Sequence, residues 1–142
     1  MKELYIFSPS VVNQLQYPRK NYFIDTGFIT ALTTKFSKNY GRLFENYIYG
    51  LLSQQCETLH YYRDREGAEV DFVSLTNGRA DTLYQVCYDL SDNDTVQREI
   101  KALLKAKETL KCNNAQLITL YSKPAIPILP EIEVITPEMF LK

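Results

Sequence analysis

Residues 68–88 of this 142-residue chain read AEVDFVSLTNGRADTLYQVCY, and this stretch decides the fold. Apolar and polar residues alternate in 68–74 and in 82–88, and the intervening LTNGRAD contains the Asn-Gly pair typical of a tight turn. A third strand-like run, 58–62, comes before them across the turn sequence RDREG. Three strands in succession, joined by turns, predict an antiparallel meander.

The alternation also sorts side chains by face. Because successive side chains of a strand point to opposite sides of the sheet, Glu69, Asp71 and Val73 are expected on one face. Val70 and Phe72 are expected on the other face. In the third run, Leu83, Gln85 and Cys87 share a face in the same way. Each strand therefore presents its acid or amide groups on one side only.

Two amphipathic helices are expected around the meander. Apolar residues at helical spacing predict one helix over 39–55 and a second over 96–111. Asp94 and Gln97 have the spacing of a capping box at the start of the second helix. On the first helix, Glu45 falls at the edge of the apolar stripe, so its carboxylate is expected at the rim of the core.

The two ends of the chain are less regular. Residues 1–38 predict an extended or partly helical segment, with a brief helix through 28–32, and they read as the remnant of a larger parent. After the second helix, 115–121 predicts a buried strand and 132–135 a short edge strand in a proline-rich tail. Residues 39–142 are therefore expected to form one α/β domain.

The composition excludes several classes of protein. Hydrophobic residues make up 45% and charged residues 23% of the chain, as in an ordinary globular domain. No membrane span and no secretory signal are recognisable, which predicts a cytoplasmic domain without a membrane partner. Three cysteines and one histidine argue against a disulfide framework or a four-ligand zinc site. The net charge of −1 limits nucleic-acid binding to a local surface.

Three segments together carry a resemblance to a known family. They are GRLFENYIYGLL (41–52), YYRDREGAEVDFV (61–73) and LYQVCYDLSDNDTVQREIKALLKAKETL (83–110). These segments resemble the C-terminal domain of unknown function (number 4143) that follows the ATPase module in prokaryotic AAA-type ATPases, within the PD-(D/E)XK nuclease superfamily. The resemblance implies a restriction-endonuclease-like α/β core with a mixed sheet of four to five strands flanked by helices. It also implies an ATPase partner, since this chain has no G-x-x-x-x-G-K-[ST] loop and hence no ATP site of that type.

The resemblance further implies a metal-dependent site. Glu45 matches the helical acid, Asp71 the strand acid and Gln85 the first residue of the third motif. In an intact site the acids bind Mg²⁺, and a lysine orients or deprotonates the attacking water. Cys87 stands in place of that lysine. A glutamine oxygen can still contact a metal, but a neutral thiol cannot replace an ammonium beside a phosphate, so Cys87 favours an inactive domain over an active nuclease.

Other residues are candidates for roles at the same site. Lys101 and Lys105 are candidate replacements for the motif lysine, although the solvated face of a helix explains both equally well. Glu69 is a candidate metal ligand, or a partner of Arg63 or Arg65 across the hairpin. The two arginines are in turn candidates for nucleic-acid contacts at the hairpin tip.

Three functions follow from these interpretations. The leading hypothesis is a non-catalytic or weakly catalytic accessory domain of an AAA-type ATPase, which engages DNA or another nucleic acid, or a protein partner. The second is an active Mg²⁺-dependent DNA nuclease with Glu45, Asp71 and Gln85 at the metal. The third is a pure protein-interaction module, such as the antitoxin-like or regulatory part of a larger ATPase machine. The fold alone does not choose among them. Independently of these functions, Glu45 could simply form an i, i+3 ion pair with Arg42 on its own helix.

Overall fold

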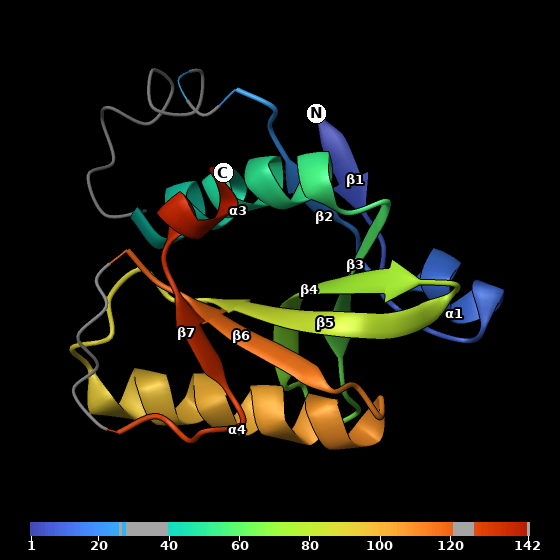
Figure 1. Ribbon diagram of the computed structural model, residues 1–142. Coiled ribbons are helices and arrows are strands. Elements are labelled where there is room, and N and C mark those ends of the chain that lie inside the picture. Colours follow the sequence, from blue (N-terminus) through green and yellow to red (C-terminus); the bar gives the residue numbers. More distant parts are fainter. Residues whose placement is uncertain (26, 28–39, 121–126, 142) are drawn as a thin grey trace.

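The computed structural model describes residues 1–25, 27, 40–120 and 127–141, and Figure 1 shows the arrangement of their helices and strands. The brief helix expected through 28–32 lies outside the described residues. In chain order the elements are β1 (Lys2–Leu4), α1 (Val11–Gln16), β2 (Lys20–Tyr22), α3 (Tyr40–Gln55), β3 (Thr58–Arg63), β4 (Glu69–Thr76), β5 (Arg79–Val86), α4 (Asn93–Thr109), β6 (Asn114–Ile118), β7 (Glu133–Ile135) and the 3-10 helix η1 (Pro137–Phe140).

The main sheet has five strands in the order β3-β4-β5-β6-β7. Strands β3, β4 and β5 pair antiparallel, whereas β5, β6 and β7 pair parallel, so the sheet is mixed. Asn77 and Gly78 form the turn between β4 and β5 with φ values of 52° and 74°, as the Asn-Gly pair predicts for a two-residue hairpin turn. The expected meander and the α/β class with a mixed sheet are both confirmed.

A helix covers each face of this sheet: α3 lies on one side and α4 on the other (Figure 1). The α4 side holds an aliphatic cluster that includes Leu83, Leu103 and Leu117. The α3 side holds a second cluster that is richer in aromatic residues and includes Ile48 and Phe72. Both expected amphipathic helices are therefore present, and each buries its apolar stripe against the sheet.

The start of α4 differs from the expected capping box. Asp92 is the N-cap, and its side chain accepts a hydrogen bond from the backbone N–H of Thr95. Asp94 lies instead in the first turn, where its negative charge complements the positive end of the helix dipole. The prediction that Asp94 and Gln97 form the cap was therefore wrong, because an aspartate two residues earlier satisfies the exposed N–H groups first.

A β-bulge in β4 also corrects the expected alternation of side chains. His60 pairs with Val73 but Tyr62 pairs with Val70, so two residues of β4 lie opposite Tyr61 alone. Val70 and Val73 consequently both join the cluster on the α4 side, while Phe72 joins the cluster on the α3 side. A bulge of this kind re-aims side chains, and here it lies beside Asp71.

The N-terminal residues pack against the edge of the main sheet. Strands β1 and β2 form a separate two-stranded antiparallel sheet. Residue Ile6 bridges to Tyr61 of β3, and the N–H of Phe7 donates to the carbonyl oxygen of Tyr61 at 2.6 Å. Leu4, Ile6 and Tyr22 are buried in the cluster on the α3 side. This packing brings β2 next to α3 and β4.

The described cysteines Cys56, Cys87 and Cys112 are all unpaired. Within the described residues, no helix combines the length and the apolar character needed to cross a bilayer.

Candidate functional site

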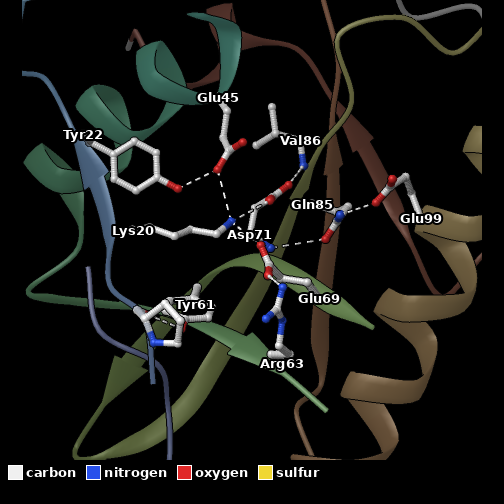
Figure 2. A network of polar contacts seen from close by, with 11 residues as sticks. Lys20, Tyr22, Glu45, Tyr61, Arg63, Glu69, Asp71, Gln85, Val86 and Glu99 are labelled. Carbon is white, nitrogen blue, oxygen red and sulfur yellow. Dashed lines mark hydrogen bonds and ion pairs between the residues drawn. The ribbon is translucent and has the colours of Figure 1, made fainter. Parts of the chain in front are cut away.

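Glu45, Glu69 and Asp71 surround the ammonium group of Lys20, as Figure 2 shows. The distances from Lys20 Nζ are 3.2 Å to Glu45 Oε1, 2.6 Å to Glu69 Oε1 and 3.1 Å to Asp71 Oδ1. We call the three acids the acidic centre, and the three acids with Lys20 the Lys20 cluster. An ammonium has three N–H donors, so each carboxylate here has one available to it. The helical acid and the strand acid lie together as expected, but around a lysine.

Strand β2 and helix α3 position Lys20, Tyr22 and Glu45. Lys20 and Tyr22 lie two residues apart on β2 and therefore point to the same side of the strand. The Tyr22 hydroxyl donates to Glu45 Oε1 at 2.5 Å, on the same oxygen that contacts Lys20. The ring of Tyr22 stacks on Tyr49 of α3 with 4.4 Å between ring centroids, and it also contacts Phe72. The rings of Tyr22, Tyr49 and Phe72 therefore pack together beside the acidic centre, and we call these three residues the aromatic floor.

Asp71 has a partner for each of its carboxylate oxygens. Oδ1 contacts Lys20, and Oδ2 accepts the backbone N–H of Val86 at 2.9 Å. Burial raises the pKa of Asp71 to about 7, and the negative charge of Glu45 adds to this effect. The charge of Lys20 and the Val86 N–H act in the opposite direction without cancelling it. Asp71 therefore changes its charge near neutral pH.

Lys20 and Tyr22 keep their protons through the physiological range. Burial alone would lower the pKa of Lys20, but the negative charges of Asp71, Glu45 and Glu69 raise it above its ordinary value. Burial, and then the charge of Glu45, raises the pKa of the Tyr22 hydroxyl. Lys20 is thus a permanent cation in this cluster, and Tyr22 is a permanent hydrogen-bond donor.

Gln85 is buried and lies next to Asp71, but it does not contact Lys20. Its Oε1 accepts the backbone N–H of Asp71 at 3.3 Å, and its amide nitrogen donates to Glu99 of α4 (Figure 2). Gln85 therefore links the backbone of β4 to α4. Its described hydrogen bonds are with the Asp71 backbone and Glu99 rather than with the side chains of the acidic centre, so its metal-binding role stays a prediction.

Cys87 lies in the core rather than at the acidic centre. It is 7% exposed, it belongs to the cluster on the α4 side, and its thiol donates to the carbonyl oxygen of Asp89. Burial raises the pKa of Cys87 to about 11. Cys87 is thus a neutral, buried thiol, which is neither a cation nor an activated nucleophile.

The two candidate replacement lysines, Lys101 and Lys105, line a cleft of about 450 Å³ together with Glu69, Asp71 and Gln85. Lys101 is exposed on α4. Lys105 Nζ lies 2.7 Å from Asp64 and 2.5 Å from Glu66, and we call these three residues the Lys105 cluster. In the part of the chain that the structure describes, neither lysine forms an ion pair with the acidic centre.

The remaining candidates are the hairpin arginines and Arg42. Arg63 lies opposite Glu69 in the strand register, and the two form an ion pair at 3.2 Å, which confirms the interpretation of Glu69 as a cross-hairpin partner. Arg65 is exposed in the turn between β3 and β4. Arg42 is exposed on α3, and the ion pair that Glu45 forms within the described residues is with Lys20 instead.

The acidic centre does not fit Mg²⁺ with its side chains in this arrangement. Mg²⁺ requires oxygen ligands at about 2.0–2.1 Å from one point. The three carboxylate oxygens instead surround a nitrogen at 2.6 to 3.2 Å, which are distances suited to an ammonium. Within the described ranges, no three Asp, Glu, His or Cys side chains are grouped so that they could hold a metal ion.

Lys20 was not among the residues expected at this site. It precedes Glu45 by 25 residues and Asp71 by 51. Its strand has only three residues, which is too short to produce a recognisable period. The one local signal is the i, i+2 spacing of Lys20 and Tyr22, which places an ammonium and a hydroxyl on one side of any strand.

The chain was compared with known proteins at three levels. Residues 40–137 match the model of a protein family described as a domain of unknown function, DUF4143. The comparisons with curated proteins and with solved structures find no match. The matched residues include Glu45, Glu69 and Asp71, whereas Lys20 and Tyr22 precede them. Because the match covers most of its length, this chain belongs to the DUF4143 domain family.

Proposed function

We propose that this chain is a cytoplasmic accessory domain of an AAA-type ATPase, with a nuclease-like fold that engages a protein partner and does not cleave nucleic acid. The observation that carries the proposal is the position of Lys20, whose ammonium lies in the middle of the acidic centre. The resemblance to domains that follow an ATPase module supports the first part of the proposal.

The charges at the centre argue against phosphodiester hydrolysis. A scissile phosphate needs cations that are available to it, namely a metal ion and the motif lysine. Here Lys20 contacts three carboxylates, Arg63 pairs with Glu69, and Cys87 is buried. A phosphate approaching this centre would therefore meet carboxylates whose cations are already engaged.

The exposed surface favours a protein partner over nucleic acid. The described residues that line the cleft beside the acidic centre include four acidic and three basic side chains, and two of the basic ones, Lys105 and Arg98, are paired with carboxylates, so the cleft has no basic surplus. The short helix α1 buries none of its residues, and Val11, Val12 and Leu15 are 67%, 60% and 64% exposed. Apolar side chains gathered on one short helix are typical of a surface that binds another protein.

Cleavage assays test the absence of catalysis. Wild type and Asp71→Ala are incubated with plasmid and single-stranded DNA in the presence of Mg²⁺ or Mn²⁺. We expect intact DNA with both proteins. Metal-dependent cleavage that disappears in Asp71→Ala would establish the active nuclease instead.

Two binding measurements test the choice of partner. We expect a tagged domain expressed in its native host to co-purify with an AAA-type ATPase, and Leu15→Asp to abolish this association. Salt-sensitive DNA binding that persists in both Asp71→Ala and Leu15→Asp would favour nucleic acid as the partner.

A further inference from the structure

We infer that the ammonium of Lys20 is the resident cation of the acidic centre, where it excludes divalent metal ions and fastens the N-terminal strand β2 to α3 and β4. The inference deepens the proposed function and rests on its view of the centre as non-catalytic. The three acids lie within the residues that match DUF4143, whereas Lys20 lies before them. The cation of the centre therefore comes from outside the matched residues.

Each of the three N–H donors of the Lys20 ammonium has a carboxylate acceptor. Its three donors face Glu45, Glu69 and Asp71, which belong to α3 and β4. The ring of Tyr61 lies 5.6 Å from Lys20 Nζ, measured to the ring centroid, which is within the range of a cation–π contact. A divalent ion can reach the same carboxylate oxygens only if this ammonium leaves.

The burial of the acids makes a cation necessary. The side chains of Glu45, Glu69 and Asp71 are 25%, 27% and 12% exposed, so water screens their mutual repulsion only in part. Removing Lys20 would leave Arg63, on the far side of Glu69, as the nearest paired cation. Three carboxylates around a vacated position then need protons or a metal ion to balance them. A variant without Lys20 is therefore expected to bind a hard cation that takes oxygen ligands.

Other contacts hold β2 in place without Lys20. The N–H and carbonyl oxygen of Phe23 bond to the side-chain amide of Asn46 at 2.8 Å and 2.7 Å. Tyr22 stacks on Tyr49, and the Tyr61 hydroxyl donates to the carbonyl oxygen of Pro18. The acids should therefore remain in position when Lys20 is substituted, so that cation binding can be measured on a folded protein.

The test is a titration of the whole chain with Tb³⁺, whose luminescence is sensitised by tyrosine rings close to its binding site, such as Tyr22. Calorimetric titrations with Ca²⁺ and Mg²⁺ accompany it. We expect Lys20→Ala to bind Tb³⁺ at least about tenfold more tightly than wild type. We also expect Ca²⁺ to raise the unfolding temperature of Lys20→Ala and to leave that of wild type unchanged.

Lys105→Ala is the matched control, because it removes a lysine that contacts two carboxylates outside the acidic centre, Asp64 and Glu66. Lys20→Arg keeps the positive charge and should bind no more Tb³⁺ than wild type. Lys20→Met keeps most of the length of the side chain without its charge and decides the result if Lys20→Ala does not fold.

Two results would overturn the inference. One is tyrosine-sensitised Tb³⁺ binding by wild type as tight as that of the Lys20 variants. The other is binding by Lys20→Ala and Lys20→Met no tighter than that of Lys105→Ala. A different result would overturn the proposed function alone, namely DNA cleavage by a wild-type protein that binds no metal at the acidic centre. Metal-dependent cleavage that Lys20→Met abolishes would overturn both, since Lys20 would then be acting as the nuclease lysine.

Discussion

The Lys20 cluster and the Lys105 cluster have the same chemistry and similar contact distances, yet they stand in different surroundings. Lys20 lies 2.6 to 3.2 Å from three carboxylates, and Lys105 lies 2.5 to 2.7 Å from two. The side chain of Lys20 is 22% exposed and its three carboxylate partners are 12 to 27% exposed, whereas Lys105 is 40% exposed and its partners Asp64 and Glu66 are 11% and 80% exposed. Distance therefore says little about what an ion pair contributes; burial decides it.

The two clusters also differ in what they join. Lys105 connects α4 to the turn between β3 and β4, where Glu66 is exposed and the side chain of Asp64 is largely buried. Lys20 connects β2 to α3 and to β4, and an aromatic floor of Tyr22, Tyr49 and Phe72 lies beside it. The Lys105 cluster joins two parts of the matched family domain. The Lys20 cluster instead joins the N-terminal segment to that domain.

The largest loss of stability is expected from Phe72→Ala, which removes one of the three rings of the aromatic floor beside the Lys20 cluster. Phe72 is fully buried and contacts the rings of Tyr22 and Tyr49, so truncation should lower the free energy of unfolding by about 4 kcal/mol. Urea denaturation measures this loss. Phe7→Ala, at a half-buried ring on the edge of the sheet, is the control and should cost clearly less. Equal losses from the two variants would show that the floor has no special role.

Lys20→Met should have the next largest effect. It leaves buried carboxylates without their cation, a change that typically costs on the order of 3 kcal/mol. Adding Glu45→Gln removes one of the carboxylates that Lys20 balances and keeps an acceptor for the Tyr22 hydroxyl, so it should recover part of the loss, as measured by urea denaturation of the single and double variants. If the double variant is less stable than the sum of the single changes predicts, the electrostatic explanation is wrong.

Asp71→Asn alone should change the pH dependence of stability. Burial raises the pKa of Asp71 in the native protein from 3.8 to about 7, so the native state holds an additional proton between these values. Wild-type stability should consequently fall as the pH rises from about 4 to about 7, by up to about 1.4 kcal/mol per pH unit from this group. Asparagine retains an acceptor for the Val86 N–H and does not titrate. The stability of Asp71→Asn relative to wild type should thus increase with pH, and a constant difference across this range would contradict the assignment.

Lys105→Met should have the smallest effect, and it provides the counterpart to Lys20→Met. Exposed ion pairs contribute little, because water screens the charges and the long side chains lose rotamer freedom. Asp64 is less exposed, but it also accepts the backbone N–H groups of Glu66 and Ala68, so we expect Lys105→Met to lower the thermal unfolding temperature only slightly. A loss as large as that of Lys20→Met would mean that burial does not separate the two clusters.

The elements that local patterns determine were predictable from the sequence. The Asn77-Gly78 turn fixes the β4–β5 hairpin, and the apolar periods of α3 and α4 mark both helices. The bulge beside Asp71 was not predictable, because a change of register depends on pairing with a neighbouring strand. The same limit applies to the site. Glu45, Asp71 and Gln85 were found through the family resemblance, but Lys20 reaches the acids only through tertiary packing of a three-residue strand.

The most direct test of the central claim is a crystal structure of the wild-type chain grown with Mn²⁺, with anomalous diffraction recorded to locate the metal. We expect the Lys20 ammonium to lie among Glu45, Glu69 and Asp71, with no anomalous peak at the acidic centre. A manganese ion coordinated by Glu45 and Asp71, with Lys20 displaced from between them, would contradict the claim that lysine is the resident cation of this centre.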